Sequence, residues 1–346
     1  MAFEMDEISL QSMLDPISRY AQQKLAPLCQ RHETPLSAHQ QAQVWQDFAQ
    51  LGLLPENEEG YAPWEHNDAT GRSFSIHALQ NIARASTAMA LALHHHNLSQ
   101  ALRRELHWPL VQYSSLSLAG RYGLLGLFDA PAVARDNFSA HDGPLLRQHH
   151  SLFEGANILA LLWQDGPVLC ELRDYHSRSE HNHGFESQLL YSWSGGQELH
   201  CAPIPQQALQ NLLSREWLGL CAIAAGTLQR ALQLAEDYAA LRRQGGQVIG
   251  HYPAVQSMLH SSASTLHHSR VLLDDVANSL NFNAACYLYS DTLPALRKAA
   301  QQCLQVFGGM GYMQDTGVEK TLREINHLMH ITGNPAECRL LRRGVA

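Results

Sequence analysis

Apolar residues in the C-terminal half recur with the spacing of long helices. Between residues 253 and 280 they fall at steps of three, four and seven, on one face of a helix: Val255, Met258, Leu259, Leu266, Leu273, Val276 and Leu280. Residues 206–243 contain no proline, and a further helix is expected over residues 294–307, ended by Gly308. The pattern predicts a bundle of long helices.

The N-terminal third shows the same helical pattern in shorter segments. Five apolar residues between Leu10 and Tyr20 are three or four positions apart, and Pro27 follows them. Further helices are expected over residues 38–53, 71–96 and 97–106, and Pro109 marks the next boundary.

The middle of the chain has a different pattern. Short apolar runs such as LFEGANILALLW, GPVLCEL and SQLLYSWSGGQEL are separated by Gly, Asp and Asn, which favours strands joined by turns. The prediction is a mostly α fold with a small β insert. We expect an N-terminal helical domain over residues 1–117, a β-rich domain over 118–203 and a C-terminal helical bundle over 204–346.

Composition restricts the class of protein. Apolar residues make up 45% of the chain and charged residues 16%, which is typical of a globular protein rather than a disordered one. The formal net charge of −8 argues against a nucleic-acid binder, which usually presents a basic face. We expect no membrane span, because no apolar run is long enough, and no signal peptide in MAFEMDEISLQSM.

Cysteine and histidine usage adds two expectations. The seven cysteines are scattered and form no CxxC pair, which favours reduced core thiols in the cytoplasm. Histidines include the run His94–His96, the pairs His149–His150 and His267–His268, and His181 and His183 in an expected turn. Adjacent side chains point in different directions, so the run predicts one packed ring, two solvated rings and no metal site.

Four stretches carry motifs: ARASTAMALALHHH at 83–96, SREWLGLCAIAAGTLQRALQLAEDYAALRRQGGQVIGHYPAVQSML at 214–259, QVFGGMGYMQDTGVEKTLREINHL at 305–328 and ITGNPAECRLLRRGVA at 331–346. In this order and spacing they resemble the acyl-CoA dehydrogenase superfamily. The resemblance covers the C-terminal half well, the N-terminal helices moderately and the β insert poorly. The chain therefore resembles a divergent, shortened member.

The resemblance implies a bound FAD, usually at a subunit interface of a homodimer or homotetramer. By motif position, Arg242 would meet the pyrophosphate, Gln244 would lie beside it, and Gln305, Gly308 and Gly309 would line the adenosine side. Glycines let a ligand approach the backbone, and a guanidinium matches a phosphate. From the residues alone, such glycines are more often a helix C-cap followed by a turn.

The catalytic base poses a sharper question. Most family members place a Glu just before a GT pair, and Thr332 occupies that position here. A branch that includes isovaleryl-CoA and long-chain dehydrogenases carries its Glu on an earlier helix, at the position of Glu216. The resemblance therefore makes Glu216 the candidate base, while a lone helical Glu beside Arg215 is otherwise a solvated or ion-paired residue. Glu337 matches a different position and is expected to point elsewhere.

Several family features are missing. The aromatic residue of the family's R.QFG motif is replaced by Gly245, and the segment LFDAPAVARD lacks the Thr and glycines of the family's flavin loop. A second flavin-contacting segment is reduced to LFEGAN. Phe128 and Phe153 could contact a flavin ring, but apolar strand residues more often belong to the core.

Three functions follow from this resemblance. The first is an FAD-dependent dehydrogenase of acyl-CoA or acyl carrier protein thioesters, in which Glu216 removes the α-proton and flavin N5 accepts a hydride. The second is a flavin-dependent monooxygenase on the same fold, which needs no such base. The third is a non-catalytic partner subunit of a related flavoenzyme, in a hetero-oligomer. None of the three involves nucleic acid or a membrane.

Overall fold

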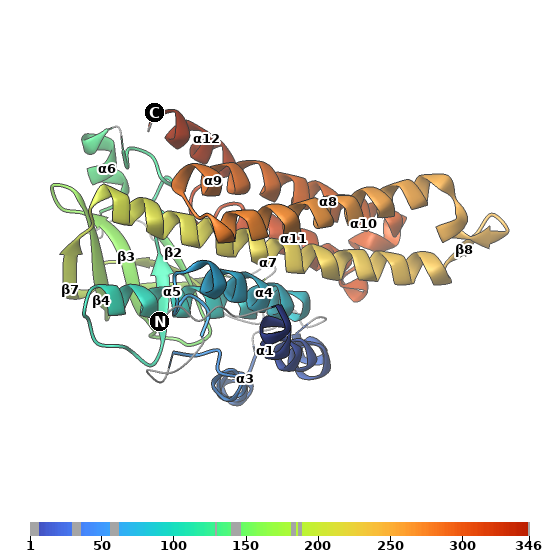
Figure 1. Cartoon of the computed structure of the whole chain (residues 1–346), viewed down its shortest axis with the longest axis horizontal. Coiled ribbons are helices and arrows are strands. Elements are labelled where there is room, and N and C mark those ends of the chain that lie inside the picture. The colour runs from blue at the N-terminus through green and yellow to red at the C-terminus, as the bar shows by residue number, and fades with distance from the viewer. Residues whose placement is uncertain are drawn as a thin grey trace.

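A computed structural model describes residues 7–29, 36–55, 62–128, 130–139, 147–180, 185 and 189–344. Helices form both ends of the chain and strands lie between them, which confirms the predicted mostly α fold with a small β insert. Figure 1 shows the strands at one end of a long helical bundle and a small hairpin at the other end.

The N-terminal helices are α1 (Glu7–Tyr20), the π-helical turn η1 (Ala21–Leu25), α2 (Ala26–Cys29), α3 (Ala38–Gln50), α4 (Ala69–Ala85) and α5 (Thr87–Glu105). The predicted break between residues 96 and 97 is wrong, because α5 runs through it. The helices separate at Ser86 instead, where the backbone is extended and the hydroxyl accepts a hydrogen bond from the Met89 N–H. Ser86 is thus the N-cap of α5.

The strands and one short helix follow as β1 (Ser114–Ser117), α6 (Pro131–Asn137), β2 (Arg147–Ser151), β3 (Asn157–Trp163), β4 (Pro167–Arg173), β5 (His176–Glu180), β6 (Leu189–Ser194) and β7 (Gln197–Pro203). They form one sheet in the order β1-β3-β4-β7 and a second in the order β2-β6-β5. Only the β1–β3 pair is parallel among these described strands. Strand β1 lies before residue 118, the predicted start of the β-rich domain, and the limits of the three domains stay a prediction.

A disulfide joins two neighbouring strands of the first sheet. Cys170 of β4 and Cys201 of β7 are directly opposite in the register and are bonded to each other. The expectation of seven reduced thiols is therefore wrong for this pair, because sequence spacing does not show which strands pair. The other five cysteines are buried and form no disulfide.

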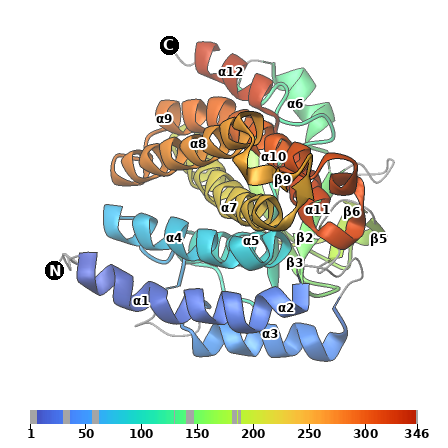
Figure 2. The same ribbon diagram turned by 90° about the vertical axis from the view of Figure 1, so that its right-hand side faces the viewer.

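The C-terminal elements are α7 (Gln206–Leu241), β8 (Arg243–Gln244), β9 (Gln247–Val248), the 3₁₀ turn η2 (Ile249–His251), α8 (Pro253–Asn278), α9 (Phe282–Tyr287), the π-helical turn η3 (Leu288–Thr292), α10 (Leu293–Val306), the 3₁₀ turns η4 (Gly308–Tyr312) and η5 (Gln314–Thr316), α11 (Val318–Leu328) and α12 (Pro335–Gly344). Figure 2 shows α1 and α3, then α4 and α5, then α7, then α8 and α9 as successive layers.

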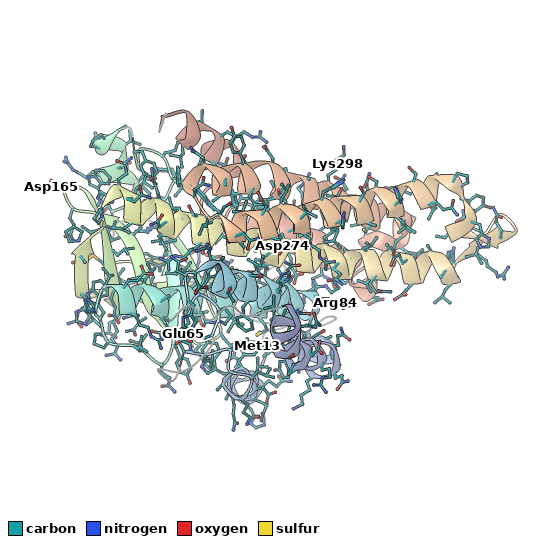
Figure 3. The ribbon with its side chains drawn as sticks, viewed as in Figure 1. Met13, Glu65, Arg84, Asp165, Asp274 and Lys298 are labelled. Atoms are coloured by element: carbon teal, nitrogen blue, oxygen red, sulfur yellow. A yellow bond between two sulfur atoms is a disulfide. The ribbon has the colours of Figure 1, made fainter. Side chains whose placement is uncertain are left out.

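Helix α7 is the central element of the core. It is long and apolar enough to cross a membrane by length and composition, which the sequence pattern does not anticipate, but 83% of its most apolar window is buried inside the fold. A buried ion pair, Arg230–Glu324, joins α7 to α11, and Thr87 of α5 donates to the same carboxylate. Charged residues such as Asp274 and Lys298 lie on the outside of the bundle (Figure 3).

Candidate active site

The residues expected to contact a cofactor line one groove at the hairpin end of the bundle. The groove has a volume of about 790 Å³, and α7, the β8–β9 hairpin, the start of α8 and the segment after α10 form its walls. All five expected contacts are in its lining: Arg242, Gln244, Gln305, Gly308 and Gly309. The fold thus brings together residues that are far apart in the sequence.

The glycines of the FGGMG segment have three different roles. Gly308 follows the end of α10 with a φ of 59°, so it is the left-handed residue that ends this helix. Gly311 is packed tightly, since an added Cβ would lie 2.6 Å from the Leu304 carbonyl oxygen. Gly309 has neither constraint: its φ is not left-handed, and an added Cβ would have no heavy atom within 4 Å. The fold explains two of the three glycines, and Gly309 faces open groove.

The hairpin gives a physical reason for the missing aromatic residue. Gly245 and Gly246 form the turn between β8 and β9 with φ values of 61° and 88°. A two-residue turn with both residues left-handed requires glycine or a similarly permissive residue. The Tyr252 hydroxyl donates to the Gln244 carbonyl at 2.8 Å and fixes the turn beside the groove.

The second part of the site is a buried cluster around Glu216, near the sheet end of α7. Glu216 has no exposed surface, so the alternative of a solvated helix residue is wrong. The neighbouring Arg215 is paired with Glu105 of α5 instead, at 2.7 and 3.1 Å. Glu216 Oε1 lies 3.2 Å from His95 Nε2 and accepts a 2.8 Å hydrogen bond from Thr332 Oγ1.

The two positions at which the family carries its base are therefore in contact. Thr332, at the more common base position, donates to the carboxylate at the alternative one. The Thr332 carbonyl also accepts a hydrogen bond from the indole N–H of Trp217 at 3.0 Å, which ties the segment to α7. Glu337 lies apart from this cluster, where it accepts the Leu124 and Asn334 backbone N–H groups.

His94 of α5 lies beside Glu216, and its ring is held in place by Trp64. Its Nε2 lies 2.9 Å from Glu216 Oε2, although the pair is not aligned as a hydrogen bond. The other ring nitrogen, Nδ1, accepts a 2.8 Å hydrogen bond from the Trp64 indole N–H, so the ring proton is on Nε2. Trp64 itself has a φ of 68°, a left-handed conformation that is unusual for a bulky residue and is often held at functional sites.

A glycine in α7 makes room for this ring. An added Cβ at Gly219 would lie 2.6 Å from His94 Nε2, so any other residue there would displace the imidazole. Gly219 is three residues after Glu216, on the same side of α7. The close approach of α5 to α7 at this point therefore depends on Gly219.

Among the described residues, further histidines follow His95 in a row that leads away from Glu216. The His95 ring packs against the His150 ring of β2, with centroids 5.9 Å apart. His150 Nε2 lies 2.9 Å from Nε2 of His327 in α11, and His327 is partly exposed. His94, His95 and His96 are all buried, so the expectation of two solvated rings is wrong. The pair His267–His268 is exposed, and His181 and His183 lie outside the described residues.

The groups around Glu216 determine whether its carboxyl group is ionised. Burial opposes ionisation, but the adjacent His95 and His94 outweigh it and hold the pKa of Glu216 well below its usual range. Burial lowers the pKa of His94 despite the neighbouring carboxylate, so this ring is neutral. Glu216 is thus an ionised carboxylate that faces three hydrogen-bond donor groups.

Comparison with known proteins shows what the C-terminal bundle and the fold are similar to. The model of the acyl-CoA dehydrogenase C-terminal domain matches residues 206–338. Isobutyryl-CoA dehydrogenase of Dictyostelium discoideum is 31% identical over 137 residues, which cover 38% of this chain and 33% of that protein. Butyryl-CoA dehydrogenase of Megasphaera elsdenii aligns in structure over 100% of this chain and 99% of that one, with a TM-score of 0.73 and 16% identity.

The C-terminal bundle of this chain is thus similar to the C-terminal domain of acyl-CoA dehydrogenases. A glutaryl-CoA dehydrogenase from Mycobacterium smegmatis, solved with FADH2, aligns over 99% of this chain and 95% of that one, with a TM-score of 0.73 and 12% identity. In the sequence alignments, this chain spans a third or less of the first curated relatives. The match in sequence is therefore concentrated in the C-terminal bundle, and the match in fold extends over the whole chain.

The tautomer of His94 argues against a metal at Glu216. Among the described residues, His94, His95 and Glu216 bring three potential ligand atoms within 4.8 Å of one another. A metal at His94 Nε2 needs a lone pair on that nitrogen, whereas the Trp64 hydrogen bond leaves the proton there. A second group of this kind contains Cys170 and Cys201, whose sulfur atoms are bonded to each other.

The segments that would face a flavin ring in the superfamily make contacts within the protein. Phe128 packs edge-on against Phe282 with centroids 6.0 Å apart, and Phe153 stacks on Tyr113 at 3.8 Å. Trp217, beside Glu216, lies between Phe282 and Tyr289 at 5.6 and 5.7 Å. These rings therefore pack against other aromatic residues of the fold.

Sequence reasoning missed Trp64, Gly219, His94 and His95 as parts of the site. Adjacent histidines diverge on their own helix, but both rings are long enough to converge on one carboxylate of the next helix. One signal was available, since a Gly in the interior of a helix, three residues after the candidate base, indicates close packing of a neighbour.

Proposed function

We propose that this chain is an FAD-dependent dehydrogenase of acyl thioesters, whose Glu216 cluster takes the α-proton. The observation that carries this proposal is the convergence of Arg242, Gln244, Gln305, Gly308 and Gly309 on one open groove. Arg242 would hold the pyrophosphate through charged hydrogen bonds, and Gly309 leaves its backbone accessible to a ligand. FAD, when bound, supplies a two-electron acceptor.

The groove and the base of one chain lie too far apart to share one FAD. Arg242 and Glu216 are on the same helix, and 1.5 Å per residue separates them by roughly 39 Å along its axis, more than an extended FAD can span. The groove of one chain would therefore serve the Glu216 cluster of a neighbour. This supports a homodimer or homotetramer, and a cytoplasmic location belongs to the same proposal.

Several residues of this chain would act together at the carbon that loses its proton. Glu216, ionised and dry, supplies negative charge where the proton leaves. Thr332 and His95 orient its Oε1, and His94, fixed by Trp64, borders its Oε2. Water is excluded because every member of this cluster is buried.

The first experiment is an absorption spectrum of the purified protein before and after FAD is added. We expect flavin bands, and we expect Arg242→Gln to weaken FAD binding by roughly 10- to 150-fold, since a hydrogen bond to a charged group contributes about 1.5–3 kcal/mol. Arg243→Gln is the matched control, because Arg243 is also exposed but does not line the groove. Butyryl-CoA, isobutyryl-CoA and butyryl carrier protein are then tested for bleaching of the flavin. A protein that stays colourless with FAD would refute the proposal.

One observation favours a second candidate, a non-catalytic partner subunit. Glu216 and His94 have no exposed surface, so no substrate carbon reaches the carboxylate in this conformation. Such a chain would contribute its groove to the FAD of an intact relative. Co-expression with such a relative tests this: a stable complex that bleaches only when the relative's own base is intact would support the partner role.

A further inference from the structure

A shift in strand register turns one carboxylate of β7 toward the disulfide at the sheet end of the molecule (Figure 1). After the pair Cys170–Cys201, the register of β4 and β7 shifts by one residue, so that Leu172 lies opposite Glu198 instead of Leu199. Paired residues of antiparallel strands point to the same face, and so do alternate residues of one strand. Cys170, Cys201 and Glu198 therefore share a face, although residues 198 and 201 of a regular strand would point to opposite faces. A bulge of this kind often re-aims a side chain at a functional site.

The three side chains bring three metal-ligating atoms together. The two Sγ atoms and a carboxylate oxygen of Glu198 all lie within 4.8 Å of one another, and Glu198 Oε2 is 3.4 Å from Cys201 Sγ. The Gln164 side-chain amide donates to the same Oε2 at 3.4 Å and orients it, as outer partners orient the ligands of metal sites. Cys170 is buried, whereas Cys201 and Glu198 are exposed, so an ion can reach this position from the solvent.

The bond between the two sulfur atoms has to be reduced before they can bind a metal. In the cytoplasm, the location that belongs to the proposed function, glutathione and small dithiol proteins keep cysteines reduced. The thiolate of a dithiol reductant attacks the exposed Cys201 Sγ, and the bond between the sulfur atoms breaks. Cys170 leaves as a thiolate and takes up a proton. The second thiol of the reductant then releases Cys201, so the reductant becomes a disulfide and two electrons pass to the protein.

We propose that the reduced pair Cys170 and Cys201 binds a zinc ion together with Glu198. Thiolates select zinc over magnesium or calcium, and zinc takes four ligands in a tetrahedron, so these three leave one position for water. Each thiol gives up its proton to the solvent as it binds the ion. The ion would join β4 to β7 where the disulfide joins them, five residues before α7 begins at Gln206, so the strand stays cross-linked in both redox states. This inference takes only the cytoplasmic location from the proposed function.

The test uses Co²⁺ as a spectroscopic substitute for zinc and needs no FAD. The whole protein is reduced with a phosphine, freed of the reductant without air, and titrated with Co²⁺. Charge-transfer bands between sulfur and cobalt report thiolate ligands, and Zn²⁺ should then displace the cobalt. The variants are Cys201→Ser and Glu198→Gln. Their matched controls are Cys286→Ala, at a buried cysteine of α9 that forms no disulfide, and Glu236→Gln, at an exposed carboxylate of α7.

We expect thiolate bands with one Co²⁺ per reduced chain, and no such bands in the unreduced protein or in reduced Cys201→Ser. Glu198→Gln should weaken binding by more than about 10-fold, since even the loss of a group that orients a ligand costs about that much. Both controls should bind like wild type. Reduced wild type without thiolate bands would overturn the proposal, and so would wild-type affinity in Glu198→Gln. A protein that binds Co²⁺ in this way but binds no FAD would support the zinc site while refuting the proposed function.

Discussion

The substitution Gly309→Ala distinguishes a glycine that a bound ligand requires from a glycine that the fold requires. No heavy atom lies within 4 Å of a Cβ added there, and the backbone is not left-handed. We therefore expect Gly309→Ala to leave the free energy of unfolding unchanged or to raise it by up to about 1 kcal/mol, through lower entropy of the unfolded chain. A methyl group in the groove should displace any ligand that rests on the backbone.

The size of the effect follows from what the methyl group prevents. If it removes one hydrogen bond between the backbone and a charged phosphate, about 1.5–3 kcal/mol is lost, which is roughly a 10- to 150-fold rise in Kd for FAD. Kd is measured by titration of FAD fluorescence, and stability by urea unfolding followed by circular dichroism. Wild-type affinity for FAD in Gly309→Ala would refute the assignment of this glycine to a ligand.

Two other glycines make the comparison interpretable. Gly311→Ala places a Cβ 2.6 Å from the Leu304 carbonyl oxygen, so it should cost about 1–3 kcal/mol of stability through overpacking. Gly166→Ala is a second open glycine, in the turn between β3 and β4, and should change neither stability nor affinity. A loss of stability in Gly309→Ala similar to that in Gly311→Ala would show that the segment is constrained by the fold alone.

Three further predictions concern stability. Arg230→Met should cost about 3–5 kcal/mol in urea unfolding, because it leaves the buried Glu324 unpaired, and the double variant with Glu324→Leu should recover much of that loss. Folding lowers the pKa of Glu216, so its contribution is complete above the unfolded pKa of about 4.3 and is lost as the pH falls. Unfolding curves should therefore show the cost of Glu216→Gln to be smaller by about 1 kcal/mol at pH 3.5 than at pH 7; an equal cost would contradict the lowered pKa. The Cys170–Cys201 bond closes a separation of 31 residues, so its reduction should lower the unfolding free energy by about 3–4 kcal/mol. A thiol titration of the unreduced, denatured protein checks the bond: seven titratable thiols would disprove it.

The fold and the groove could be anticipated from the sequence for different reasons. Helical periodicity specifies which faces are buried, whereas the groove residues around Arg242 and Gln305 were expected from the resemblance to a family motif. Glu216 was found through the alternative base position, and its contact with Thr332 then follows from the packing of two distant segments.

The environment of Glu216 could not be anticipated in the same way. The left-handed Trp64 and the N-cap at Ser86 are set by local backbone conformations that apolar periodicity does not report. The convergence of His94 and His95 depends on how closely α5 approaches α7, which Gly219 decides. The Cys170–Cys201 bond depends on strand register, which alternating apolar residues leave open in a fully buried strand.

The separation of Arg242 from Glu216 along α7 has a genetic consequence. In the assembly proposed above, each reaction centre combines the groove of one chain with the base cluster of another. Two inactive parents, Arg242→Gln and Glu216→Gln, would then complement each other when co-expressed, because a mixed dimer contains one centre built from two unaltered halves. A chain with both substitutions could not be rescued by either parent, since its groove and its base cluster would both be altered.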